Sequence, residues 1–226
     1  IYIIFIYIYI YSNFFINVII MIDYKDINKK FKKYKLPPSN DSMKKICLPK
    51  KFKLQPSQKF LADYFTRKDV HPGLLVYHKI GAGKTCSAVN IAERLKKKMA
   101  IMVVLPAALI GNFRNELRSQ CAGETYLTNK HRKKLEKLKP SDDMFKKIIK
   151  KSDKIINRYY TIYSYHKFVA LAKENKINLD NHLLIIDEVQ NMISMTGTFY
   201  ANLKRTVDKA KKLKIVLLSA TPMFDK

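Results

Sequence analysis

Hydrophobic and polar positions follow each other in blocks along most of the chain. Short apolar runs, typical of buried strands, occur at 74–77, 101–106, 159–164, 183–187 and 214–220. The stretches between them repeat apolar residues at helical spacing, as at Ala88, Ile91, Ala92 and Leu95, and again at Phe199, Leu203, Val207 and Ala210. Further helices are expected over 56–67, 108–120 and 165–175. Uniformly apolar strands that alternate with helices indicate an α/β fold, a mainly parallel sheet covered on both faces.

Three regions do not follow this alternation. Residues 1–22 are an almost unbroken apolar run, interpreted as translated upstream sequence, with a membrane anchor and an aggregation-prone strand as the alternatives. Residues 23–53 mix lysines with prolines without a clear period and are expected to form an extended basic lead-in. Residues 129–157 are a lysine-dense insertion, expected to be helical in part. The folded domain is therefore placed at 54–226.

The charge of the chain points to a polyanionic partner. Lys and Arg number 44 against 18 Asp and Glu, a formal net charge of +26. Basic groups that neutralise phosphates release counterions, which favours binding to nucleic acid. Because adenine- and thymine-rich codons also yield many Lys, Ile, Asn and Tyr residues, genome composition is the alternative source of this charge. Cys47, Cys86 and Cys121 are odd in number and far apart, so we expect reduced thiols, with neither a disulfide framework nor a metal cluster.

The stretch "GAGKT" at 81–85 follows a predicted strand and opens a predicted helix, as a phosphate-binding loop requires. Gly81 and Gly83 allow backbone N–H groups to approach phosphate oxygens, and the helix amino terminus adds partial positive charge. Lys84 would reach the β- and γ-phosphates, and the Thr85 hydroxyl would bind Mg²⁺. The full pattern also asks for a glycine where this chain has His78. The predicted nucleotide-binding residues here are Gly81, Ala82, Gly83, Lys84 and Thr85.

Two further strands carry polar residues at their carboxyl ends, where ligands of parallel sheets bind. The strand in "LLIIDEVQN" delivers Asp187 and Glu188, a carboxylate pair that is costly to place without a cation. Asp187 would hold Mg²⁺, and Glu188 would orient and deprotonate the water that attacks the γ-phosphate. The strand in "VLLSATPMF" ends in Ser219, Ala220 and Thr221, which could sense the γ-phosphate and pass on its state.

In this order, the three motifs resemble the first RecA-like domain of a superfamily 2 helicase or translocase, a three-layer P-loop NTPase fold. "IGAGKT" resembles motif I, "DEVQ" motif II and "SAT" motif III. "VVLPAALIGNFRNEL" is similar to motif Ia of the Snf2-like branch, whose members often lack the first glycine of the loop. More narrowly, "LLVYHKIGAGKT" and "LLIIDEVQNMIS" resemble transcription-type helicases of large DNA viruses, such as the early transcription factor small subunit and nucleoside triphosphatase I.

The resemblance implies roles for residues that spacing alone does not single out. Gln58 in "LQPSQKFLADYF" would read adenine, and Gln190 of "DEVQ" would belong to the coupling set with Ser219, Ala220 and Thr221. Pro106, Asn112 and Ser164 would lie along the nucleic-acid track. ATP and Mg²⁺ are the implied cofactors.

The implied activity is ATP-driven movement on DNA or RNA, with RNA polymerase or other transcription factors as further partners. The family also needs a second RecA-like domain, which this chain lacks, so we expect a fragment that holds the ATP-binding half. An inert nucleotide- and nucleic-acid-binding module is the alternative for these 226 residues. No membrane partner is expected, unless residues 1–22 form an anchor. The expected location is intracellular, in the virion or in a viral factory of the host cytoplasm.

Overall fold

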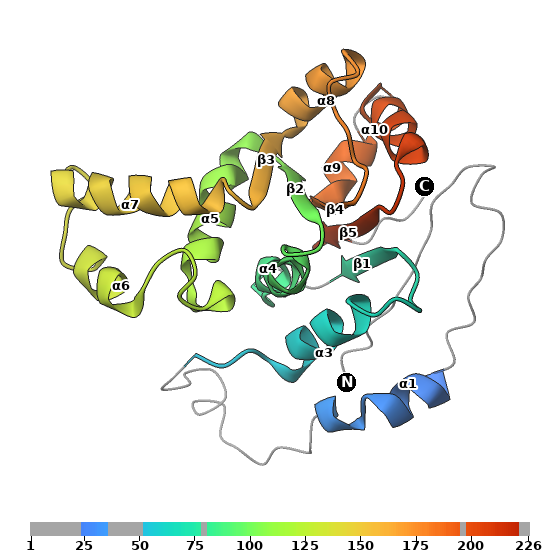
Figure 1. Ribbon diagram of the computed structural model, residues 1–226, viewed down its shortest axis with the longest axis horizontal. Coiled ribbons are helices and arrows are strands. Elements are labelled where there is room, and N and C mark those ends of the chain that lie inside the picture. The colour runs from blue at the N-terminus through green and yellow to red at the C-terminus, as the bar shows by residue number, and fades with distance from the viewer. Residues whose placement is uncertain (1–23, 36–51, 78–80, 195–197, 222–226) are drawn as a thin grey trace.

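The computed structural model describes residues 24–35, 52–77, 81–194 and 198–221, shown in Figure 1. At their centre lies a five-stranded sheet in the order β1-β5-β4-β2-β3. Every neighbouring pair is parallel, which confirms the α/β class predicted from the uniformly apolar strands. The strands are β1 (Gly73–Tyr77), β2 (Ala100–Leu105), β3 (Tyr160–Ser164), β4 (His182–Ile186) and β5 (Lys214–Ser219).

The register brings the carboxyl ends of the strands to one edge of the sheet. Tyr77 of β1 pairs with Ser219 of β5, and Leu105 of β2 pairs with Ser164 of β3. β5 lies between β1 and β4, so the segments that leave β1 and β4 flank the end of β5. The sequence-distant motifs that follow these strands therefore share one edge.

Helices cover both faces of this sheet (Figure 1). The α-helices after the first segment are α3 (Pro56–Phe65), α4 (Lys84–Leu95), α5 (Ile110–Arg118), α6 (Asn129–Leu135), α7 (Asp143–Ile156), α8 (Tyr165–Lys173), α9 (Val189–Ser194) and α10 (Thr198–Lys209). Short 3-10 turns η2 (Ala107–Leu109) and η3 (Gln120–Ala122) precede and follow α5. These bounds confirm the predicted helices to within a few residues.

Alternation along each strand divides the core into two layers. Ile101, Val103 and Leu105 of β2 pack with α3, α4 and α5, whereas Met102 and Val104 pack with α8 and α9. This two-sided burial is why the central strands β2 and β4 are apolar apart from His182 at the start of β4. Removing each such side chain from water contributes about 1.5–3 kcal/mol, so the two layers hold the sheet rigid beneath the residues at its edge.

The lead-in segment differs from its prediction. Residues 24–30 form α1 (Tyr24–Lys30) and η1 (Lys32–Tyr34) follows, where an extended chain was expected. The reason is tertiary: the ring of Phe31 packs edge-on against Phe60 and against Tyr64 of α3, with centroids 5.1 Å and 6.0 Å apart. The interpretation of residues 1–22 lies outside the described residues. Within the described part, no helix is long and apolar enough to cross a membrane.

The insertion, expected to be helical in part, contains the two helices α6 and α7. Asp153 of α7 forms ion pairs with Arg114 and Arg118 of α5. The Arg118 side chain is only 9% exposed and also donates to Ser152. A buried guanidinium needs such partners, so this cluster anchors α7 to the body of the domain.

The prediction of three reduced thiols is wrong for two of them. Cys86 and Cys121 form a disulfide between α4 and η3, with Cα atoms 5.5 Å apart. Oε1 of Glu116 lies 2.8 Å from Sγ of Cys121, and burial raises the pKa of this carboxyl. Cysteine spacing could not reveal the pair, because α4 and η3 meet only after the chain has passed through β2 and α5.

Candidate nucleotide-binding site

The described part of the loop before α4 contains two glycines in left-handed backbone conformations. Gly81 and Gly83 have φ angles of 82° and 77°, a left-handed region that residues with a Cβ seldom adopt. Gly83 is the N-cap of α4, and its carbonyl accepts bonds from the backbone and hydroxyl of Ser87 at 3.0 and 3.2 Å. Ala82 is exposed, Thr85 is half-buried, and the position of His78 lies outside the described residues. The amino end of α4 is therefore open toward the carboxyl edge of the sheet.

Gln58 lies against this loop. Its side chain is buried, and its Nε2 donates to the carbonyl of Gly83 at 3.3 Å. Its Oε1 accepts from the backbone of Gln55, which caps α3 at 2.9 Å. A carboxamide has two N–H groups and two lone pairs, so one of each remains for a further partner. The structure places Gln58 beside the loop, and its adenine-reading role remains a prediction.

Asp187 and Glu188 follow β4 at the same edge. Asp187 is 6% exposed, and its backbone N–H donates to Val104 of the neighbouring strand β2 at 3.0 Å. Glu188 has a φ of 53°, and its N–H donates to Oδ1 of Asp187, also at 3.0 Å. The sharp change of direction at Glu188 ends the strand and begins α9, so the two carboxylates leave the sheet at its rim.

Electrostatics bring Lys84 and Asp187 together. Burial, and then the negative charge of Glu188, raise the pKa of Asp187 to about 6. The Glu188 N–H and the positive charge of Lys84 act in the opposite direction. Lys84 is itself 9% exposed. Two buried groups of opposite sign on α4 and after β4 thus face one region, although more than a hundred residues separate them in the chain.

Ser219 is joined to the acidic pair through Gln190. Nε2 of Gln190 donates to Oε2 of Glu188 at 2.6 Å, and the Ser219 hydroxyl lies 2.8 Å from Oε1 of Gln190. The same hydroxyl lies 2.7 Å from the carbonyl of Thr221 and accepts from the Thr221 N–H at 3.3 Å. Ala220 is half-buried in this turn. The structure therefore brings together the residues of the predicted coupling set.

The residues predicted to contact nucleic acid fall into two groups. Pro106 and Ser164 follow and end the adjacent strands β2 and β3, at the same edge as the site. Ser164 caps α8 by accepting from the Lys167 backbone at 3.3 Å, so its hydroxyl is already engaged. Asn112 is exposed on α5, beyond η2. Contact of these three residues with a nucleic-acid strand stays a prediction.

One residue of the site was not singled out from the sequence. Tyr165 is the first residue of α8, and its hydroxyl donates to the main-chain carbonyls of Asp187 and Glu188. Its position directly after Ser164 was the available signal. Only the packing of α8 beside β4 shows what the hydroxyl reaches.

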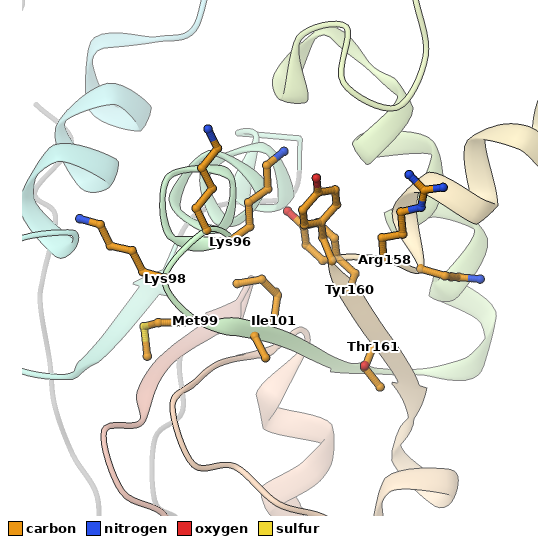
Figure 2. A pocket seen from close by; sticks show the side chains of 11 residues that line it. Lys96, Lys98, Met99, Ile101, Arg158, Tyr160 and Thr161 are labelled. Atoms are coloured by element: carbon orange, nitrogen blue, oxygen red, sulfur yellow. The ribbon is translucent and has the colours of Figure 1, made fainter.

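A separate hollow of about 290 Å³ lies at the opposite edge of the sheet, between the turns that follow α4 and α7 (Figure 2). Lys96 lines it but is already paired with Glu93 and lies over the rings of Tyr126 and Tyr159. Figure 2 shows the side chains of Lys98 and Arg158 pointing away from each other. This hollow begins where β2 and β3 begin, so it is remote from Lys84 and the acidic pair.

The residues at the carboxyl edge have the composition that Mg²⁺ and a nucleoside triphosphate require. Oxygen ligands are available from Thr85 and Asp187, which suits a hard cation. Lys84 and the open amino end of α4 supply positive charge for phosphate oxygens. A parallel α/β domain with this loop and this strand-borne acidic pair belongs to the P-loop nucleoside triphosphatases.

Comparison with protein families matches residues 51–224 to ResIII, described as the type III restriction enzyme, res subunit. The chain belongs to this family, and the resemblance to the first RecA-like domain of superfamily 2 helicases is confirmed. The match covers most of the chain and includes all three motifs.

Viral proteins and one solved ATPase core are similar to the chain. A predicted ATP-dependent RNA helicase of Acanthamoeba polyphaga mimivirus is 55% identical over 90% of the chain, which spans 36% of that protein. A termination factor NPH-I homolog of African swine fever virus is 25% identical over 66% of the chain, which spans 20% of that protein. The Sulfolobus solfataricus SWI2/SNF2 ATPase core in complex with dsDNA is 15% identical, with a TM-score of 0.48 over 74% of this chain and 31% of that one.

Proposed function

We propose that this chain is the ATP-binding part of a nucleic-acid helicase or translocase that couples ATP hydrolysis to movement on DNA or RNA. The observation that carries the proposal is the arrangement at one edge of the sheet of the glycine loop with the buried Lys84, whose charge lowers the pKa of Asp187, and of the acidic pair Asp187 and Glu188. Because the chain spans only 36% of its mimivirus relative, turnover and movement are proposed for the whole protein.

Each residue has a distinct task in this proposal. Thr85 and Asp187 would hold Mg²⁺, which supplies charge neutralisation on the phosphates when bound. Lys84 and the N–H groups of the Gly81–Gly83 turn hold phosphate oxygens. Glu188 orients a water and takes its proton. Its carboxylate accepts from Gln190, so its direction depends on the state of that amide.

Coupling would pass from Glu188 through Gln190 to Ser219. Ser219 ends β5, which lies between the strands that deliver the loop and the acidic pair. A shift of the end of β5 relative to the end of β4 would change the two hydrogen bonds of Gln190. Pro106, Asn112 and Ser164 would form the track for the strand, whose phosphates also attract the excess of lysines.

We also propose a role in viral transcription, which the relatives support and the geometry does not address. One relative is a termination factor homolog, and RNA polymerase or other transcription factors are the proposed partners. We place the protein inside the infected cell, in the virion or the viral factory. The domain limits that we propose are 1–22, 23–53 and 54–226, with the insertion at 129–157.

The test is ATP hydrolysis by the full-length protein with Mg²⁺, measured without nucleic acid and with single-stranded RNA or DNA. We expect stimulation by at least one of the two. Lys84→Ala should lose triphosphate binding, whereas Glu188→Gln should keep binding and lose 10²–10⁴-fold in kcat. Lys97→Ala, an exposed lysine at the opposite edge, is the matched control and should change neither quantity.

Hydrolysis that nucleic acid does not stimulate would contradict the proposed translocase. The same assay on residues 1–226 addresses the second candidate, a binding module without turnover. Loss of an arginine supplied from elsewhere can cost 10³–10⁵ in rate, so we expect nucleotide binding with little hydrolysis from these residues alone. Brisk turnover by this piece would exclude that second candidate.

A further inference from the structure

The hydroxyl of Tyr165 contacts the backbone that presents the acidic pair. Tyr165 is 4% exposed, and its hydroxyl donates to the carbonyl oxygen of Asp187 and, at 2.9 Å, to that of Glu188. A phenol has one proton, so the two carbonyls share one donor. Both carbonyl oxygens are therefore turned toward the same point.

These two carbonyls lie on either side of the Cα atom of Glu188. Their relative direction is set by the φ and ψ angles of that residue, and its φ of 53° is in the left-handed region. A residue with a Cβ keeps such a conformation only where its surroundings impose it. A donor that binds both carbonyls at once imposes it directly, and the direction of the Glu188 side chain follows from it.

Tyr165 also belongs to the turn that ends β3. It directly follows Ser164, which is the last residue of β3 and the N-cap of α8. The side chain is buried in the core layer that also contains Val104, Ile186 and Val189. The hydroxyl therefore moves only if the β3–α8 turn or the end of β4 moves.

We propose that Tyr165 is a positioning residue that holds Asp187 and Glu188 in the conformation needed for hydrolysis and links them to the β3–α8 turn. This inference rests on the proposed ATPase function and extends it to a residue outside the recognised motifs. Gln190 contacts the side chain of Glu188, whereas Tyr165 contacts the backbone of Glu188. The two residues therefore hold Glu188 by separate contacts.

The ionisation of Tyr165 is consistent with a permanent donor. Burial, followed by the negative charges of Asp187 and Glu188, raises the pKa of its phenol above the usual value. The hydroxyl therefore keeps its proton throughout the neutral range, and the contact itself does not switch with pH.

The test compares Tyr165→Phe with Tyr160→Phe in the full-length protein. Both substitutions remove one buried hydroxyl from the β3 region and keep the ring. Tyr160 is 3% exposed and donates to Glu93 at 2.8 Å, at the opposite end of the same strand, so it is the matched control. The measurements are the thermal midpoint, the Kd for a fluorescent ATP analogue, kcat with saturating nucleic acid, and hydrogen exchange of the peptide 182–192.

We expect Tyr165→Phe to lower kcat at least tenfold, to leave the nucleotide Kd within twofold, and to speed exchange of the amides around Glu188. Tyr160→Phe should lower the thermal midpoint to a similar extent, but it should leave kcat and the exchange of the amides around Glu188 unchanged. An unchanged kcat in Tyr165→Phe overturns the proposal, whatever the exchange shows. An equal loss of kcat in Tyr160→Phe overturns it too, because the effect would then be general destabilisation.

The same experiment separates this inference from the proposed function. If the unsubstituted protein hydrolyses no ATP, the ATPase proposal fails. Hydrogen exchange then still decides whether Tyr165 holds the Glu188 backbone. Faster exchange in Tyr165→Phe but not in Tyr160→Phe supports this positioning role, and unchanged exchange in Tyr165→Phe contradicts it.

Discussion

The hydroxyl of Ser219 lies 2.8 Å from Oε1 of Gln190 and thereby connects the end of β5 to the acidic pair after β4. Through its other amide atom, Gln190 donates to Glu188 at 2.6 Å. Ser219 lies in the strand next to β1, from which the glycine loop departs. A short side-chain path thus links the ends of β5 and β4, and backbone pairing joins the end of β5 to that of β1.

This path predicts a selective loss of coupling. Ser219→Ala should leave the nucleotide Kd within twofold and lower the stimulation of hydrolysis by nucleic acid, because Gln190 loses one of its two partners. Gln190→Ala should do the same, and the double variant should be no worse than either single one, since both break one path. Ser152→Ala, which removes a buried hydroxyl on the distant α7, is the control. Additive losses would show that Ser219 and Gln190 act separately.

From the geometry of the glycine loop we expect alanine at Gly81 and at Gly83 to weaken nucleotide binding to different extents. A Cβ on Gly83 would lie 2.6 Å from Nε2 of Gln58, whereas a Cβ on Gly81 meets nothing within 4 Å. Both have positive φ, so each alanine carries about 1–2 kcal/mol of backbone strain. Gly83→Ala must also displace Gln58, and it should weaken binding of an ATP analogue more than Gly81→Ala does. Equal Kd values for the two variants, measured by fluorescence titration, would contradict the close contact.

Asp187 predicts a pH-dependent stability of the nucleotide-free protein. Its folded-state pKa of about 6 is above the usual 3.8 because burial disfavours the charged form. The folded state then binds more protons than the unfolded state between these values, so stability falls as pH rises through this window. The full effect is about 3 kcal/mol at 1.36 kcal/mol per pKa unit.

Asp187→Asn removes this penalty, so it should stabilise the protein at pH 7.5 and have little effect near pH 3.5. Denaturant unfolding in EDTA without nucleotide measures the difference. Asp208→Asn, at an exposed carboxylate of α10, should show no such pH-dependent gain. If the difference in unfolding free energy between Asp187→Asn and the parent is the same at pH 7.5 and at pH 3.5, the raised pKa is excluded.

The disulfide predicts a thiol count and a stability difference. Of the three cysteines, only Cys47 should react with a thiol reagent in unreduced, denatured protein, and all three after reduction. Cys86→Ser should lower the free energy of unfolding by about 3–4 kcal/mol, as expected for a bridge that closes a loop of 35 residues. Cys47→Ser is the control. Three reactive thiols before reduction would restore the prediction of reduced cysteines.

Local sequence was sufficient to predict the five strands and most of the helices. Apolar runs such as 183–187 predicted the strands, because a strand covered on both faces has no solvent side to mark. The glycine pattern at 81–85 predicted the open helix terminus, since only the absence of a Cβ permits that backbone. Such signals depend on neighbours in the chain, so they can be read without the fold.

Contacts between distant segments could not be read in this way. The helix at Tyr24–Lys30, the Cys86–Cys121 bond and the hydrogen bonds of Tyr165 all depend on which surfaces meet after folding. Gln58 beside Gly83 and Ser219 beside Gln190 were placed in a common site by resemblance, but their partners are set by strand order. The sequence by itself determined which side chains are available for phosphate and metal chemistry. Tertiary structure decided which of them face one another, because the order β1-β5-β4-β2-β3 sets the neighbours at the rim of the sheet.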